Sequence, residues 1–264
     1  MITLVTAEPP DAVGASMAMP TLNWANIDTL VSSGISGDLG VILRKRPQHI
    51  GDGKTTDEIY PVIELKVGER LQVSLDDGIK WTAIKQKKWS LGPVLEYRQS
   101  FSDKLPRGAH RMPDAFELGG FAVYSSGVGD IEMRLRRAIN SYQGWSGDVA
   151  YDAGVRLSPK TALGIELRGS WADSNFSDQF FGLRGRHSHE FNLPRVLKNN
   201  YFSAGTELTL GHKLDDRMTV FAQVSADRIY GEEWRSPILK SRNIFIFSLG
   251  MTRHFGAPRE DWPS

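Results

Sequence analysis

Three alternating runs in the last third of the chain decide the fold: YFSAGTELTLG at Tyr201–Gly211, MTVFAQVSADRIY at Met218–Tyr230 and NIFIFSLGMTRHF at Asn243–Phe255. One side of the second run is apolar throughout: Met218, Val220, Ala222, Val224 and Ala226. The other side carries polar residues, among them Thr219 and Gln223. A period of two indicates a β-strand with one apolar face and one polar face.

The connections between these runs alternate in length. A tight turn, Lys213 to Asp216, joins the first two runs, and a longer polar loop around Gly231 to Ser241 joins the last two. Long antiparallel strands joined alternately by short turns and long loops are typical of a transmembrane β-barrel. The sequence therefore predicts an all-β fold of this kind, with short periplasmic turns and longer extracellular loops.

The composition excludes several other classes of protein. The 264 residues are 40% hydrophobic with a mean hydropathy of −0.32, as expected either of a soluble protein or of a barrel with a polar lumen. No run of 18 apolar residues exists, which excludes a helical membrane span. A net charge of +1 argues against a nucleic-acid partner, and the absence of cysteine excludes disulfides and thiolate metal sites. We expect no cofactor.

The rest of the chain continues the same pattern from Ile35. The count is about twelve strands, with ten as the alternative, and the run at 79–84 is short and irregular. This divides the chain into a loose N-terminal segment (1–33), an outer-membrane barrel (34–255) and a tail (256–264). Turns at Gly127, Ser158 and Asp215 are expected on the periplasmic side, and polar loops beginning at Arg46, Ser100, Ala172 and Glu232 outside. Pro93 suggests a bulge in its strand.

Charged residues lie opposite the apolar stripes on most of these strands. About twelve strands enclose a lumen too wide for aliphatic side chains to fill, so we expect the charges inside and the apolar face toward lipid. We predict that the inward charges form a paired network, with Asp148 or Asp152 as the acidic partner of Arg134. Its predicted members are Glu96, Arg98, Glu132, Arg134, Arg136, Asp148, Asp152, Arg156, Glu166, Arg168, Glu207 and Asp227.

Aromatic residues lie near the ends of several runs, where interfacial girdles are expected in a membrane barrel. The alternative is that they are ordinary core aromatics. They are Trp89, Trp145, Trp171, Tyr97, Tyr124 and Tyr230.

Catalytic and metal-binding chemistry finds little support in the sequence. An outer-membrane hydrolase needs a serine–histidine pair near the outer rim. None of the six histidines lies beside a serine on an outward strand face, so an enzyme is not expected: His49, His110, His187, His189, His212 and His254. The loop residues Arg184, Arg186, His187, His189 and Glu190 indicate either a metal site, contacts to lipopolysaccharide phosphates or a solvated polar loop, and we favour the loop.

Several motifs in the C-terminal half carry a family resemblance. They are Trp171-Ala172-Asp173, Gln179-Phe180-Phe181-Gly182, Gly231 with Trp234, Ser236-Pro237-Ile238, and Leu249-Gly250-Met251. With them, the region from about Ile35 to Phe255 resembles the MipA/OmpV family, the MltA-interacting protein family of outer-membrane β-barrels. The chain departs from that family at Arg253, where an aromatic is usual, and in a tail of nine residues after Phe255.

The resemblance implies a protein of the Gram-negative outer membrane, in contact with its lipid and lipopolysaccharide. It also implies a scaffold that links a lytic transglycosylase to a peptidoglycan synthase, with a passive porin-like channel or a surface adhesin as alternatives. It implies no catalytic residues. No secretory signal is visible, since the first basic residue is Arg44 and Glu8, Pro9 and Pro10 interrupt any apolar core. We expect that such a signal was removed, or that the start is truncated or misassigned. The sequence leaves open the partner's identity and whether the lumen is open.

Overall fold

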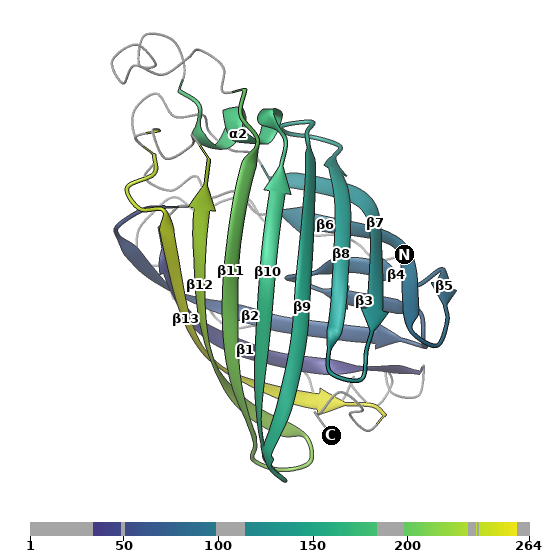
Figure 1. Ribbon diagram of the computed structural model, residues 1–264. Coiled ribbons are helices and arrows are strands. Elements are labelled where there is room, and N and C mark those ends of the chain that lie inside the picture. The colour runs from purple at the N-terminus through teal and green to yellow at the C-terminus, as the bar shows by residue number, and fades with distance from the viewer. Residues whose placement is uncertain are drawn as a thin grey trace, which may run out of the picture.

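The described residues of the computed structural model, 34–48, 51–98, 114–183, 198–231, 236 and 238–257, are almost all β-structure (Figure 1). The strands are β1 (Ile35–Pro47), β2 (Thr55–Val67), β3 (Leu71–Ser74), β4 (Gly78–Trp81), β5 (Ile84–Lys85), β6 (Trp89–Arg98), β7 (Ala115–Ser125), β8 (Asp130–Ala138), β9 (Trp145–Ser158), β10 (Thr161–Ala172), β11 (Tyr201–Lys213), β12 (Met218–Tyr230) and β13 (Asn243–Phe255). One helix, α2 (Ser174–Phe181), lies between β10 and β11.

Twelve of these strands close into an antiparallel barrel. Consecutive strands pair with each other, β1 pairs with β13, and β4 pairs with β6 to complete the ring. The two-residue strand β5 is additional and pairs with β6 beside β4. The prediction of a closed barrel of about twelve strands is confirmed.

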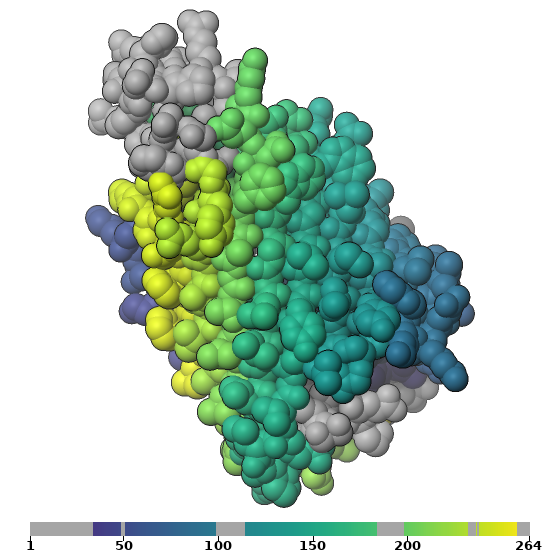
Figure 2. Space-filling view, viewed as in Figure 1, coloured from purple at the N-terminus to yellow at the C-terminus, as the bar shows by residue number. Residues whose placement is uncertain are grey.

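The alternation of side chains places the apolar stripes outside. Leu43, Ile59 and Leu249 are 54 to 61% exposed, although each lies well inside a strand of 13 residues. Figure 2 shows the strands from β8 to β13 as one continuous outer wall. Such a belt of exposed apolar side chains is the surface that a membrane barrel presents to lipid.

Aromatic residues lie at both ends of this belt. Trp89 and Tyr124 face each other near the periplasmic ends of β6 and β7, with ring centroids 4.8 Å apart. Tyr97, Trp145 and Tyr230 are exposed near the extracellular ends of their strands. Tyr124 and Trp171 are half-buried, so the exposure expected of an interfacial girdle holds for four of the six predicted aromatics.

Short turns and long connections lie at opposite ends of the barrel. The turns at Gly127, Ser158 and Asp215 lie at one end, and the connection that contains α2 lies at the other (Figure 1). The Asp76-Asp77-Gly78 turn joins β3 to β4, and Gly78 has a φ of 74°, a value that glycine adopts without strain. Among the described residues, none of the helices has the length and apolar content of a membrane-crossing helix.

The structure corrects three details of the sequence interpretation. The first polar loop does not begin at Arg46, because β1 continues to Pro47 and β2 begins at Thr55. Arg46 Nε donates to Glu58 Oε1 at 2.7 Å, so the two polar side chains stabilise each other across paired strands. The irregular run at 79–84 divides into β4 and β5.

Pro93 causes no bulge in β6. The ladder between β6 and β7 runs without a shift through the Pro93–Gly120 pair. The N–H of Ala83 donates to the carbonyl of Leu91, so the main-chain polar groups of Leu91 point toward β4 and β5. Those of Pro93 point the same way, because residues two apart in a strand share a direction. The missing donor of Pro93 therefore falls at the break between those two strands, where no ladder bond is lost.

Candidate functional site in the barrel lumen

A buried carboxylate, Glu117 of β7, lies at the centre of the charges inside the barrel. Its side chain is 0% exposed and accepts hydrogen bonds from Arg98 Nε at 2.6 Å, Arg136 Nε at 3.1 Å and the Ser146 hydroxyl at 2.8 Å. The Tyr142 hydroxyl donates a further bond to it. A buried charge with this many donors has its desolvation offset by hydrogen bonds.

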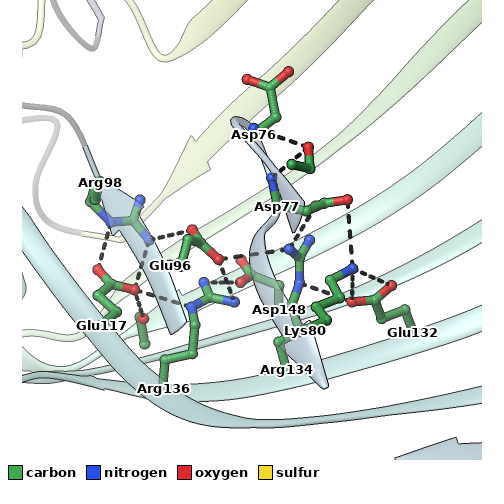
Figure 3. Close-up of polar contacts among 12 residues, drawn as sticks. Asp76, Asp77, Lys80, Glu96, Arg98, Glu117, Glu132, Arg134, Arg136 and Asp148 are labelled. Carbon is green, nitrogen blue, oxygen red and sulfur yellow. Dashed lines mark hydrogen bonds and ion pairs between the residues drawn. The ribbon is translucent and has the colours of Figure 1, made fainter. Parts of the chain in front are cut away.

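Arg136 of β8 connects Glu117 to the neighbouring acids. Its side chain is 1% exposed, Nη1 lies 3.2 Å from Glu96, and Nη2 contacts Asp148. Arg98 lies 3.9 Å from Glu96 as well. The cluster therefore extends over β6, β7, β8 and β9, with acids and bases alternating (Figure 3).

The β3–β4 hairpin supplies two further charges to this cluster. Arg134 Nη1 donates to Asp77 at 2.9 Å, and Lys80 Nζ lies 2.7 Å from Glu132 and 3.5 Å from Asp77. Arg134 also lies 3.4 Å from Glu132. Asp77 and Lys80 were not among the predicted network residues, because the sequence identified the first only as part of a turn and the second as part of an irregular run.

The predicted partner of Arg134 was wrong. Arg134 and Asp148 are directly opposite in the β8–β9 ladder, yet Asp148 pairs with Arg136 and Arg134 pairs with Asp77, Glu132 and, at 3.7 Å, Glu96. The long Arg134 side chain reaches the hairpin, which lies in the barrel wall between β2 and β6. That position depends on which strands pair to close the ring, and strand periodicity does not encode this pairing.

A second, smaller cluster lies on the neighbouring strands β10, β11 and β12. Arg168 of β10 donates to both oxygens of Asp227, at 2.8 and 2.6 Å, and to Glu166 at 2.8 Å. Glu207 lies 3.7 Å from Arg168 and accepts from Gln223 at 3.1 Å. The bidentate pair with Asp227 fixes the guanidinium in one orientation.

Two of the twelve predicted residues lie outside these clusters as the structure describes them. Asp152 is exposed to the lumen and forms no ion pair with any described residue. Arg156 is exposed close to the periplasmic end of β9. The structure thus divides the predicted network into a large cluster, a small cluster and these two residues nearer the periplasm.

Aromatic side chains cap the large cluster on the extracellular side. Asp173 caps the N-terminus of helix α2, and its carboxylate accepts from the backbone N–H groups of Asn175 and Phe176. Phe176 and Phe180 stack with centroids 3.8 Å apart, and the Arg98 guanidinium lies 5.7 Å from the Phe176 ring. With Phe181 and Tyr201, which stack at 5.8 Å, these rings form the buried core of the barrel mouth.

Tyr142 links the aromatic cap to the charges. It contacts Phe176 edge-on at 5.3 Å and donates its hydroxyl hydrogen to Glu117. Burial, together with the nearby Glu117 charge, raises the pKa of the Tyr142 hydroxyl above its ordinary value, so it stays a donor at neutral pH.

A cavity of about 580 Å³ lies on the other side of the clusters, at the periplasmic mouth. Its lining has mixed charge and includes Glu64, Lys66, Asp77, Lys80 and His254. Helix α2 and the β8–β9 loop line another cavity, of about 650 Å³, at the extracellular rim. The lumen between the two is occupied by paired charges and stacked rings.

The described histidines lie at the periplasmic end. His212 Nδ1 lies 2.9 Å from the Thr161 hydroxyl, and His254 Nδ1 lies 3.4 Å from Asp38. His49, His110 and the cluster Arg184, Arg186, His187, His189 and Glu190 lie outside the described residues. Within the described ranges, no three histidine, aspartate or glutamate side chains group as a metal site would require.

The comparison with protein families decides the relationship. The family model described as "MltA-interacting protein MipA" matches residues 39–255. The chain belongs to this family. The resemblance in the sequence is thereby confirmed, and with the closed barrel it identifies an outer-membrane β-barrel protein.

Solved structures with similar folds are outer-membrane proteins of low identity. A loop L8 deletion mutant of OmpT, an outer membrane protein of Vibrio cholerae, is 9% identical with a TM-score of 0.40, over 84% of this chain and 98% of that one. The KdgM porin is 8% identical with a TM-score of 0.41, over 83% and 99%. The COG4313 outer membrane channel from Pseudomonas putida F1 is 11% identical with a TM-score of 0.42, over 83% and 96%. A search of curated proteins finds no match.

Proposed function

We propose that this member of the MipA family is a non-enzymatic scaffold of the outer membrane. In this proposal the barrel anchors its periplasmic end in lipid and lipopolysaccharide, and that end holds a lytic transglycosylase of the MltA type next to a peptidoglycan synthase. The family description names MltA as the interacting partner, which supports the first half of the proposal.

The observation that carries the proposal is the filled lumen. Glu117 and Arg136, which are 0 and 1% exposed, and the stacked rings of Phe176 and Phe180 occupy part of the lumen, and in this proposal they obstruct the path of an ion. Removing one partner from a buried ion pair costs about 3–5 kcal/mol. A pathway that requires such breakage conducts poorly, so the function belongs to the outer surfaces.

The periplasmic end has the features of a docking surface. Its turns are short, and Asp215 accepts from the N–H groups of Arg217 and Met218 at 2.7 and 2.8 Å, which fixes that turn. These bonds lower the pKa of the Asp215 carboxyl, so the turn keeps its charge at neutral pH. Exposed Lys87 and Lys88 lie between β5 and β6 and give this rim positive charge.

The test is binding of the purified barrel, in detergent, to a purified MltA-type transglycosylase. We expect Lys87→Glu combined with Lys88→Glu to weaken binding about tenfold at low salt, because rim charges steer association. The matched control reverses two exposed lysines at the extracellular end, Lys54 and Lys198, and should bind as the wild type does. Absence of binding by the wild type contradicts the scaffold.

The second candidate is a passive porin-like channel. The open periplasmic cavity and the exposed Asp152 favour it, since they give a hydrated path through part of the barrel. Single-channel recording in planar bilayers separates the two functions. We expect silence from the wild type, and stable openings would favour the channel.

A further inference from the structure

The β3–β4 hairpin is too short to complete the barrel wall. β3 pairs with β2 only over residues 64–67, and β4 pairs with β6 only at Val94 and Leu95. Among the described residues, β2 at 55–62 and β6 at 96–98 therefore have a paired strand on one side only. We call the wall between these two stretches the notch. Three strand spacings separate β2 from β6 beside the hairpin, roughly 14 Å.

The main chain of β2 is directed into the notch. The N–H of Leu75 donates to the carbonyl of Ile63 at 3.3 Å, so Ile63 points toward the hairpin. Residues two apart along a strand point the same way, so Asp57, Ile59 and Pro61 direct their main-chain groups into the notch. Pro61 has no N–H, and proline in a strand is typical of an unpaired edge.

The notch lies at the depth of the lipid. Ile59 is paired in register with Leu43, and both are outward and more than half exposed in the apolar belt. Unpaired backbone groups at this depth are tolerated only where they are buried in protein or line a water-filled cavity. Among the described residues no strand pairs with these groups, which favours the second case, a hydrated opening between the outer leaflet and the lumen.

An arginine without a hydrogen bond lies behind the notch. Arg44 of β1 is 23% exposed, lies 5.2 Å from the Tyr60 ring and is 3.8 Å from Asp76, and it donates no hydrogen bond to a described residue. Arg46, two residues along, instead donates to Glu58 at 2.7 Å and to its neighbour's carbonyl. The Arg44 guanidinium has five donors, and an anion is the ligand that would satisfy them.

The hairpin tip leaves space beside Arg44. Asp76 is 65% exposed, although the hairpin forms part of the barrel wall. Figure 3 shows Asp76 turned away from the ion cluster, whereas Asp77 faces Arg134 and Lys80. The outer face beside the tip is apolar, with exposed Leu75 and Ile79.

We propose that the notch is a lateral entrance to a binding site for a long-chain carboxylate. The carboxylate binds the Arg44 guanidinium beside Tyr60, and the chain leaves through the notch along Ile59, Leu75 and Ile79. Glu58 is already paired with Arg46, which leaves Arg44 beside the carboxylate of Asp76. This favours a ligand with a single negative charge, because Asp76 would repel a second one. This selects a fatty acid over a phosphate head group.

The test uses a fatty acid with a photoreactive diazirine near its carboxylate and the folded protein in nanodiscs. We expect wild-type adducts on peptides of β1 and β2 and about tenfold less labelling of Arg44→Gln, since one charge-assisted bond is lost. The matched control, Arg46→Gln, should label within twofold of the wild type. Asp76→Asn should label more strongly, because it removes a repelling charge; this expectation holds even if Arg44→Gln fails to fold.

Three outcomes would overturn the proposal. One is equal labelling of the wild type and folded Arg44→Gln, with folding checked by heat-modifiable gel migration. Another is adducts confined to the outer belt. The third is stronger Arg44-dependent labelling by a phosphatidylglycerol with the same photoreactive group, which would assign the site to phospholipid instead.

Discussion

Neighbouring residues in a strand of this barrel face different surroundings, one the lipid and the next the lumen. Ile165 faces outward and Glu166, the next residue, faces inward, where it accepts from Arg168 at 2.8 Å. The apolar side chain is stabilised by lipid, and the carboxylate by a partner that also holds Asp227. Neighbouring substitutions should therefore differ in cost according to the face that they alter.

We predict that Ile165→Arg lowers the free energy of unfolding by about 2–4 kcal/mol, the cost of a cation near the bilayer midplane. Glu166→Gln should cost about 1 kcal/mol or less, because Arg168 keeps its pair with Asp227. The measurement is urea unfolding of each variant in liposomes. Equal costs would mean that the two faces are not distinct.

The pairing of Arg134 with the hairpin gives a second residue-level prediction. Arg134→Ala and Asp77→Ala should each destabilise the protein, and the double variant should cost about 0.5–3 kcal/mol less than their sum, since the 2.9 Å pair is lost once. Arg134→Ala with Asp152→Ala serves as the control and should be additive, because Asp152 pairs with no described residue. Additivity of the first pair would mean that these charges are separately solvated.

Among the elements, the long strands were predictable and the short ones were not. The runs from Tyr201 to Phe255 alternate over 13 residues each, so lipid and lumen specify their two faces along the whole length. β4 has four residues and β5 two, too few for alternation to identify a strand. The same alternation predicted most charged members of the candidate site. Asp77 and Lys80 were missed, because they reach the large cluster only when the β3–β4 hairpin pairs with β2 and β6 to close the ring.

Helix α2 was missed for a different reason. Its eight residues are too short for a stable isolated helix, and packing of Phe176, Phe180 and Phe181 in the barrel mouth stabilises it instead. The sequence did contain a signal: Asp173 is a suitable N-terminal capping residue, and Phe176 and Phe180 follow it with a spacing of four. The surrounding region is otherwise polar and resembles a loop.

At the scale of this element, we predict that Phe176→Ala lowers the free energy of unfolding by about 3–5 kcal/mol, as expected for a buried ring that stacks at 3.8 Å. Asn175→Ala, on the rim side of the same turn, should cost less than about 1 kcal/mol. Thermal unfolding in detergent, followed by circular dichroism, measures both. A similar cost for the two would mean that the aromatic cap is not a packed core.

The whole molecule is a barrel with two different ends: aromatic rings pack beside α2 at one, and a cavity of about 580 Å³ lies at the end with the short turns. This asymmetry matters for function only if the short turns face the periplasm. The sorting of short turns and long connections to opposite ends supports that orientation. The orientation also determines which end of the barrel a cell-wall enzyme can contact, the rim with Lys87 and Lys88 or the end covered by α2.

The orientation can be tested directly because the chain has no cysteine, so a single introduced thiol is the only one to react. Lys198→Cys, beside the α2 connection, should react with a membrane-impermeant maleimide on intact cells. Lys160→Cys, in the turn between β9 and β10, should react only after the outer membrane is permeabilised. Both positions are exposed, so a difference in labelling reports the side of the membrane rather than burial. Labelling of Lys160→Cys on intact cells would reverse the barrel and remove the periplasmic docking surface from the side where peptidoglycan enzymes work.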